Sequence, residues 1–243
     1  MKSKILKIAL VGLTNAGKST LVNCIVGETI SITNKKINTT QELILGITNI
    51  NNNQLIAKAV FGIFPAYSKD EFVYTDKVKF KFPRQLMDKG SQSTNFSLAD
   101  FIAPQNDYIG LFAVTAGHGL DKIVANFENN NDDYNSIMVK VLADRLVEAL
   151  AEKLHQIVRI EYWGYANNEK LTVNEILKEK YQGIRPAPGY PACPDHSEKN
   201  NIWKILDVEK NIGITLTENK AMNPASSICG WYFSHPNSKY FNL

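Results

Sequence analysis

The glycine-rich stretch at residues 12–20 has the residue types and the spacing of a phosphate-binding loop. Its sequence, GLTNAGKST, fits the pattern G-x-x-x-x-G-K-[ST] between a short apolar run and apolar residues at helical spacing. In such a loop, backbone N–H groups surround the phosphates, the lysine reaches the β- and γ-phosphates, and the serine hydroxyl binds Mg²⁺. The sequence therefore predicts a nucleotide site formed by Gly12, Asn15, Ala16, Gly17, Lys18, Ser19 and Thr20.

A second stretch, residues 183–196, combines four prolines with side chains that bind anions and aromatic rings. Prolines at this density exclude a helix and a central strand, so we expect a stiff, extended loop. Arg185 offers a planar fork for a carboxylate or phosphate, Gly189 permits close approach to the backbone, and Tyr190 offers a stacking face. This combination favours a preorganised small-molecule site; a structural loop or a proline motif for a protein partner is the alternative.

Strands and helices that must position these loops follow one another without a regular βαβ order. Strands are expected at 7–12, 59–64, 71–75, 78–82, 108–114 and 226–233, and helices at 98–102, 133–162, 173–181 and 198–210. On the long helix, Asp144, Arg145, Glu148 and Glu152 flank the apolar stripe. We predict an α+β fold, a mixed or antiparallel sheet with flanking helices, preceded by a partial α/β P-loop segment. An Asn-rich stretch places the boundary between residues 1–54 and 55–243.

Composition indicates an ordinary globular protein. Of 243 residues, 44% are hydrophobic and 21% are charged, which excludes global disorder and disulfide-rich miniproteins. The net charge of +3 gives no reason to expect nucleic acid, and no apolar run would span a bilayer. Cys24, Cys193 and Cys229 lack metal-ligand spacing, so we expect reduced, buried thiols in a cytoplasmic protein. Lysine far outnumbers arginine, and the four arginines are Arg84, Arg145, Arg159 and Arg185.

The N-terminal segment resembles the Era family of ribosome-assembly GTPases. The resemblance lies in NAGKSTLVN at 15–23, GETIS at 27–31 and NTT at 38–40, and it runs from about residue 4 to residue 54. It implies GTP and Mg²⁺, with Ser19 and a switch threonine, Thr40 or its neighbour, as metal ligands. The sequence has no N-K-x-D motif to read guanine, and its one D-x-x-G, at 107–110, precedes a strand-like run instead of ending one. A working GTPase is therefore not expected.

The remaining three quarters of the chain resembles the activation domain of cobalamin-dependent methionine synthase. The shared motifs are, in order, FGIFPA at 61–66, SLADFIAP at 97–104, DYIGLFAVT at 107–115, DDYN at 132–135, KVLADRL at 140–146, YWGY at 162–165, RPAPGYPACPDH at 185–196, GWYFSHP at 230–236 and SKYF at 238–241. Compared with the family, the domain is expected to be truncated at both ends. The chain has no D-x-H-x-x-G cobalamin motif, so any cobalamin must come in trans.

The resemblance implies a module that binds S-adenosylmethionine for the reductive methylation of cobalamin in methionine biosynthesis. In the family, Arg-x-x-x-Gly-Tyr and an aromatic pair contact this ligand. These positions, with the residues between them, are Arg185, Pro186, Ala187, Pro188, Gly189, Tyr190, Tyr240 and Phe241. Arg185 would pair with the methionyl carboxylate, and Glu148 would offset the amino or sulfonium charge. No catalytic residue is assigned to this chain.

The implied partners are cobalamin-binding modules of methionine synthase on another chain and a flavodoxin or reductase, with no membrane or nucleic acid. The chain would take part in methyltransferase activity only when paired with the cobalamin-carrying chain. Two alternatives stay open. One is a degenerate Era-like GTP-binding protein, which the P-loop favours. The other is a non-functional hybrid of two truncated genes, because the two resemblances meet abruptly near residue 55.

Overall fold

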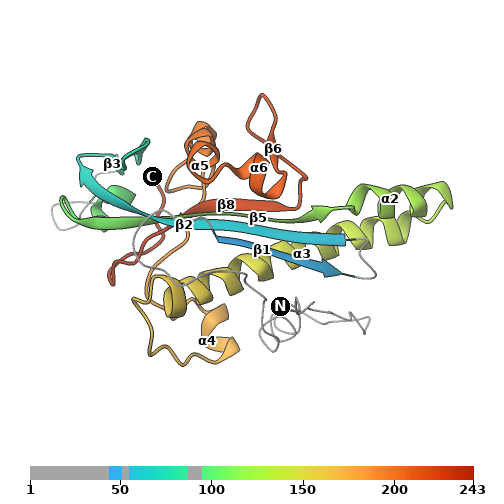
Figure 1. Cartoon of the computed structure of the whole chain (residues 1–243), viewed down its shortest axis with the longest axis horizontal. Coiled ribbons are helices and arrows are strands. Elements are labelled where there is room, and N and C mark those ends of the chain that lie inside the picture. Colours follow the sequence, from blue (N-terminus) through green and yellow to red (C-terminus); the bar gives the residue numbers. More distant parts are fainter. Residues whose placement is uncertain (1–43, 51–54, 87–94) are drawn as a thin grey trace.

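The structure is a computed structural model that describes residues 44–50, 55–86 and 95–243 (Figure 1). The predicted P-loop at 12–20, Thr40 and Cys24 lie outside the described residues. In the described part, an antiparallel sheet runs in the order β4-β3-β2-β5-β8, and β1 pairs with β2 beside this path. The strands are β1 (Ile44–Ile50), β2 (Leu55–Lys69), β3 (Phe72–Tyr74), β4 (Lys79–Lys81), β5 (Asp107–His118) and β8 (Ser227–Tyr232). The predicted antiparallel α+β architecture is confirmed.

Helices lie on both faces of this sheet (Figure 1). Along one face runs the 25-residue helix α3 (Asp133–Ile157), which continues into a π-helical turn, η2 (Val158–Tyr162). It packs against α2 (Leu120–Asn129) and β5. On the other face lie α5 (Lys199–Leu206) and α6 (Val208–Ile212). The remaining elements are η1 (Leu98–Phe101), α4 (Val173–Leu177), η3 (His196–Glu198) and a small sheet of β6 (Thr215–Leu216) and β7 (Met222–Asn223).

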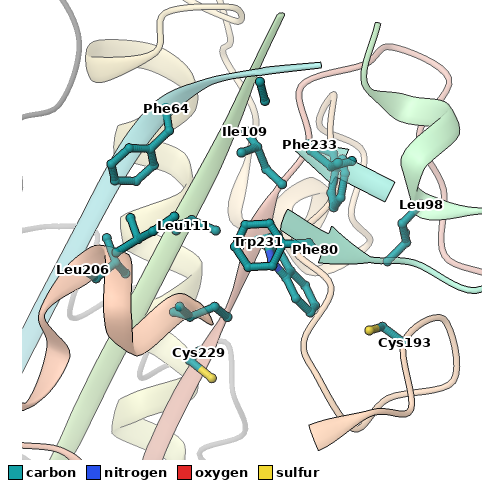
Figure 2. Close-up of a cluster of buried hydrophobic side chains, with 14 of the residues drawn as sticks. Phe64, Phe80, Leu98, Ile109, Leu111, Cys193, Leu206, Cys229, Trp231 and Phe233 are labelled. Atoms are coloured by element: carbon teal, nitrogen blue, oxygen red, sulfur yellow. The ribbon is translucent and has the colours of Figure 1, made fainter. Parts of the chain in front are cut away.

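Two hydrophobic cores result from the alternation of side chains along the strands. Val60 of β2 enters the core shared with α5 and α6, while the next residue, Phe61, enters the core shared with α3. Figure 2 shows the first core around Trp231 of β8, whose ring meets Phe80 and Phe82 edge to face at centroid distances of 5.8 and 5.0 Å. Aromatic rings of this size supply a large share of the burial energy of such a core.

The described cysteines confirm the expectation of buried thiols. Cys193 and Cys229 are free and buried, and both belong to the first core (Figure 2). Burial raises the pKa of each thiol to about 12, so both stay protonated at neutral pH.

Several expectations about single elements are wrong, and the helix expected at 173–181 ends at Leu177. Strand β2 does not end at residue 64 but continues through Pro65 to Lys69, and β5 does not end at residue 114 but continues to His118. The helix expected at 198–210 is divided at Asp207, which adopts a left-handed backbone conformation with φ of 47°. Helix α2 was not expected at all, although its N-terminus follows Gly119, whose φ of 87° suits glycine.

Candidate functional site

The predicted binding loop begins as an extension of the sheet. Ile184 exchanges two backbone hydrogen bonds with Phe233, at 3.1 and 3.0 Å, and the Trp231 N–H donates to the Pro186 carbonyl at 3.0 Å. Ile184 is buried in the first core. Because successive side chains of an extended segment point to opposite faces, Arg185 faces the side on which α3 lies. The loop's attachment to β8 therefore determines where the guanidinium goes.

Arg185 is held from three directions. Its Nη1 lies 2.7 Å from Oε2 of Glu152 on α3 and donates to the Tyr181 hydroxyl at 2.8 Å. Its backbone N–H donates to the hydroxyl of Tyr240 at 3.0 Å. The Arg185 and Glu152 side chains are 21% and 11% exposed, so this ion pair is mostly removed from water. The predicted site residues Arg185 and Tyr240 are thus brought together.

The pKa of each group in the Arg185–Glu152 pair depends on its burial and on the charge of its partner. Burial opposes the charge of Arg185, but Glu152 and Tyr181 outweigh it and keep the pKa of the guanidinium above its ordinary value. Burial likewise raises the pKa of the Glu152 carboxyl, and the neighbouring Arg185 only partly reverses this rise. Arg185 is therefore a permanent, mostly buried cation that suits an anionic group of a ligand.

The tip of the loop is a tight, hydrogen-bonded turn. Gly189 has a φ of +92°, which favours glycine, and its N–H donates to the Cys193 carbonyl at 2.8 Å. The ring of His196 lies against the Gly189 Cα, so a Cβ there would collide with it. Tyr190 at the tip is 65% exposed, which leaves its ring face available for stacking. The prediction of a stiff loop agrees with this geometry.

The other predicted residues occupy separate places. Phe241 packs in an aromatic cluster with Phe96 and Phe101, at centroid distances of 6.0 and 6.4 Å. Glu148 pairs with Arg145 on the half-exposed surface of α3, at 3.2 Å. The α3 carboxylate that contacts Arg185 is instead Glu152, one helical turn further on, which the sequence reasoning did not select. The signal was its four-residue spacing from Glu148, which places both on one helix face.

Behind Arg185 lies a second, fully buried ionic group. Arg159 of η2 donates from Nε and Nη2 to both carboxylate oxygens of Glu169, at 2.9 and 2.8 Å, and its side chain is 0% exposed. Its guanidinium also lies over the Tyr181 ring, 3.9 Å from the centroid. Tyr181 therefore connects the two arginines: its ring contacts Arg159 and its hydroxyl accepts from Arg185.

His155 completes this buried layer. Its ring stacks on Tyr232 at a centroid distance of 4.9 Å and meets Tyr181 edge to face at 5.0 Å. Burial and the charges of Arg159 and Arg185 hold the pKa of the imidazole well below its ordinary value. The folded protein therefore keeps His155 neutral at a pH where the unfolded chain binds a proton.

This difference predicts an acid-sensitive stability. The unfolded chain takes up the His155 proton near pH 6.5 and the folded chain does not, so the free energy of unfolding falls as the pH drops below that value. From pH 6.5 to pH 5.5 the expected loss is roughly 1 kcal/mol. Urea denaturation at several pH values should show it, and His155→Phe should flatten the slope. Equal slopes for both proteins would contradict the assignment, because the opposite contribution of Glu152 is common to both.

Two classes of feature are not found in the part of the chain that the structure describes. No three His, Cys, Asp or Glu side chains there form a cluster that could hold a metal ion. No helix in those residues combines the length and apolar character needed to cross a membrane.

Comparison with known proteins identifies the fold and its family. A family model described as the activation domain of vitamin B12-dependent methionine synthase matches residues 28–243. The chain belongs to this activation-domain family. A solved structure, the crystal structure of the MetH reactivation domain bound to AdoHcy, is similar with a TM-score of 0.76 and 49% sequence identity. The similarity covers 79% of this chain and 62% of that one, so the chain spans less than two thirds of its relative.

The activation-domain match includes only part of the predicted N-terminal segment, 1–54, and all of the segment 55–243. It begins at residue 28, after the P-loop motif at 12–20 and before the predicted boundary at residue 54. Backbone pairing of β1 with β2, from Ile44–Phe61 to Ile50–Leu55, crosses the same boundary. The Era-like resemblance has no support among the known proteins matched, and GTP and Mg²⁺ binding stays a prediction.

Proposed function

We propose that this activation domain binds S-adenosylmethionine at the Arg185 loop and serves the reductive methylation of a cobalamin carried by another chain. One observation carries the proposal: a buried, ion-paired Arg185 lies at the base of a rigid loop whose exposed tyrosine suits an aromatic ligand. The solved relative was crystallised with AdoHcy, which shares the adenosine and the amino-acid carboxylate of S-adenosylmethionine.

Each group of the ligand has a chemically matched residue. The carboxylate would bind the Arg185 fork, which is the side chain best suited to planar anions. Tyr190 and Tyr240 are 65% and 45% exposed, so both have ring surface available for the adenine. Glu148, which pairs with Arg145 one helical turn before Glu152, would have to turn toward the ligand to compensate the positive charge of its ammonium or sulfonium group. Because the loop is already ordered by its prolines and hydrogen bonds, binding costs little conformational entropy.

The reaction needs components from outside this chain. Bound S-adenosylmethionine would supply a methyl group, and a flavodoxin or reductase would supply one electron to the cobalamin. The contribution of the chain itself is to bind the methyl donor and to present its sulfonium group at the surface that faces the cobalamin module. A cytoplasmic location is part of the same proposal, because it is where the reductant would be met.

Isothermal titration of S-adenosylmethionine tests the proposal. Arg185→Ala should weaken binding about ten- to a hundred-fold, because a charge-assisted contact contributes roughly 1.5–3 kcal/mol. Arg84→Ala is the matched control, since Arg84 pairs with Asp100 outside the proposed site and its loss should leave affinity unchanged. Wild-type affinity in a folded Arg185→Ala protein would refute the site.

A further inference from the structure

Both side-chain contacts of Arg185 engage the same nitrogen. Nη1 lies 2.7 Å from Glu152 Oε2 and 2.8 Å from the Tyr181 hydroxyl. A guanidinium carries five N–H donors in a rigid plane, so fixing one corner also fixes the direction of the opposite edge. That edge, formed by Nε and Nη2, has the two parallel donors that bind a carboxylate in a bidentate manner.

Glu152 is well placed to hold this orientation. It projects from α3, a long helix packed along the sheet, and its side chain is only 11% exposed. The charges of the buried Arg159 and of Glu179 also act on this carboxylate, while Arg159 keeps a carboxylate partner of its own, Glu169. Without Glu152, Nη1 of Arg185 would lose its ion-pair partner and keep the contact with the Tyr181 hydroxyl, so the guanidinium could turn toward solvent.

We propose that Glu152 is a positioning residue, which directs the Nε–Nη2 edge of Arg185 at the ligand carboxylate and so favours adenosyl thioethers and sulfonium compounds that carry an amino-acid carboxylate. This inference rests on the proposed function. The alternative is that Glu152 competes with the ligand for Arg185. Positioning is favoured because Glu152 engages one corner of the fork and leaves the bidentate edge to the ligand.

Two ligands distinguish a positioning role of Glu152 from a general effect of its loss on the fold. S-adenosylmethionine carries the amino-acid carboxylate, whereas 5′-methylthioadenosine keeps the adenosine and lacks it. Glu152→Ala should weaken binding of S-adenosylmethionine at least tenfold and change that of 5′-methylthioadenosine less than twofold. Glu152→Gln keeps an oxygen that accepts from Nη1, so it should recover part of the loss.

Glu128→Ala is the matched control. Glu128 pairs with Lys140 at 3.1 Å, and Lys140 precedes Glu152 by twelve residues, about 18 Å along the helix. Its removal should affect neither ligand. If Glu152→Ala strengthens S-adenosylmethionine binding, Glu152 is a competitor and the proposal is overturned. An equal loss for both ligands overturns it too, because a merely structural role would not distinguish them.

A ligand-free measurement keeps this inference separate from the proposed function. In the wild-type protein, restricted rotation of the Arg185 guanidinium should give distinct Nη1 and Nη2 signals in nitrogen-15 NMR, and Glu152→Ala should average them. Averaged signals in the wild type overturn the positioning role whatever binds. Distinct signals in a protein that binds neither ligand would support the positioning of Arg185 and refute the proposed function.

Discussion

Replacing Arg159 by alanine is expected to lower the free energy of unfolding by about 3–5 kcal/mol. The guanidinium is fully buried, and its partner Glu169 is 6% exposed, so the variant leaves a carboxylate in the interior without its bidentate partner. Tyr181 also loses the cation that lies over its ring. Urea denaturation followed by circular dichroism measures the effect.

The exposed pair between Arg84 and Asp100 is the matched control for the Arg159 variant. Its geometry is also bidentate, at 2.7 Å for both contacts, but its side chains are 35% and 33% exposed. Arg84→Ala should therefore cost about 1 kcal/mol or less. The double variant Arg159→Met, Glu169→Leu should recover most of the loss, because apolar residues of similar volume often replace a buried pair at little cost. A loss below 1 kcal/mol in Arg159→Ala would refute this account of the interior.

Strand positions are predicted best where apolar and polar residues alternate or where a run of residues is apolar. The prediction fails where the extent of a strand depends on its pairing with neighbouring strands. Pro65 is the clearest case. A proline cannot donate to a sheet, yet β2 runs through it, pairing Pro65 with Tyr108 of β5. On its other side, among the residues that the structure describes, pairing with β1 reaches from Leu55 to Phe61 and pairing with β3 begins at Tyr67. Within that part of the chain Pro65 therefore lies at a locally unpaired edge, which no pattern within β2 reveals.

The candidate site shows the same division. The prolines, Arg185 and Tyr190 predict a stiff anion-binding loop from local chemistry alone, and in the structure backbone hydrogen bonds tie this loop to β8 and across its own tip. The sequence alone could not show which carboxylate of the long helix contacts Arg185. Glu148 and Glu152 lie on one face of α3, and only the packing of α3 against the sheet decides which of them meets Arg185. Sequence spacing identifies the helix face on which a residue lies, whereas tertiary packing determines which turn of that helix contacts Arg185.

The four arginines of this lysine-rich chain lie in two kinds of environment. Two of the four arginines, Arg159 and Arg185, form the buried ionic layer behind the loop. Arg84 and Arg145 form pairs on or near the surface instead. Arginine keeps its charge when buried and offers a planar fork, and lysine at either buried position would lose the bidentate or stacked geometry. The small number of arginines indicates which positions to examine, but the burial of each side chain determines its role.

Gly230→Ala is expected both to destabilise the protein and to weaken ligand binding at least tenfold. A Cβ at Gly230 would collide with the backbone carbonyl oxygen of Pro186 and lie 3.0 Å from Phe112 Cε1. The adjacent Trp231 N–H donates to that same carbonyl at 3.0 Å, which holds the loop against β8. The added methyl must therefore push the residue that follows Arg185, and overpacking of this kind costs roughly 1–3 kcal/mol.

A variant of another glycine in the sheet, Gly117, separates the effect on stability from the effect on ligand binding. A Cβ at Gly117 of β5 would collide with the ring of Pro224, so Gly117→Ala should destabilise by a comparable amount. Neither Gly117 nor Pro224 contacts the Arg185 loop in the interactions described, and the affinity of this variant for S-adenosylmethionine should stay as in the wild type. Thermal unfolding and titration well below the melting temperature measure both quantities. If Gly230→Ala binds normally when folded, the contact of β8 with Pro186 supports the fold but does not set the position of Arg185.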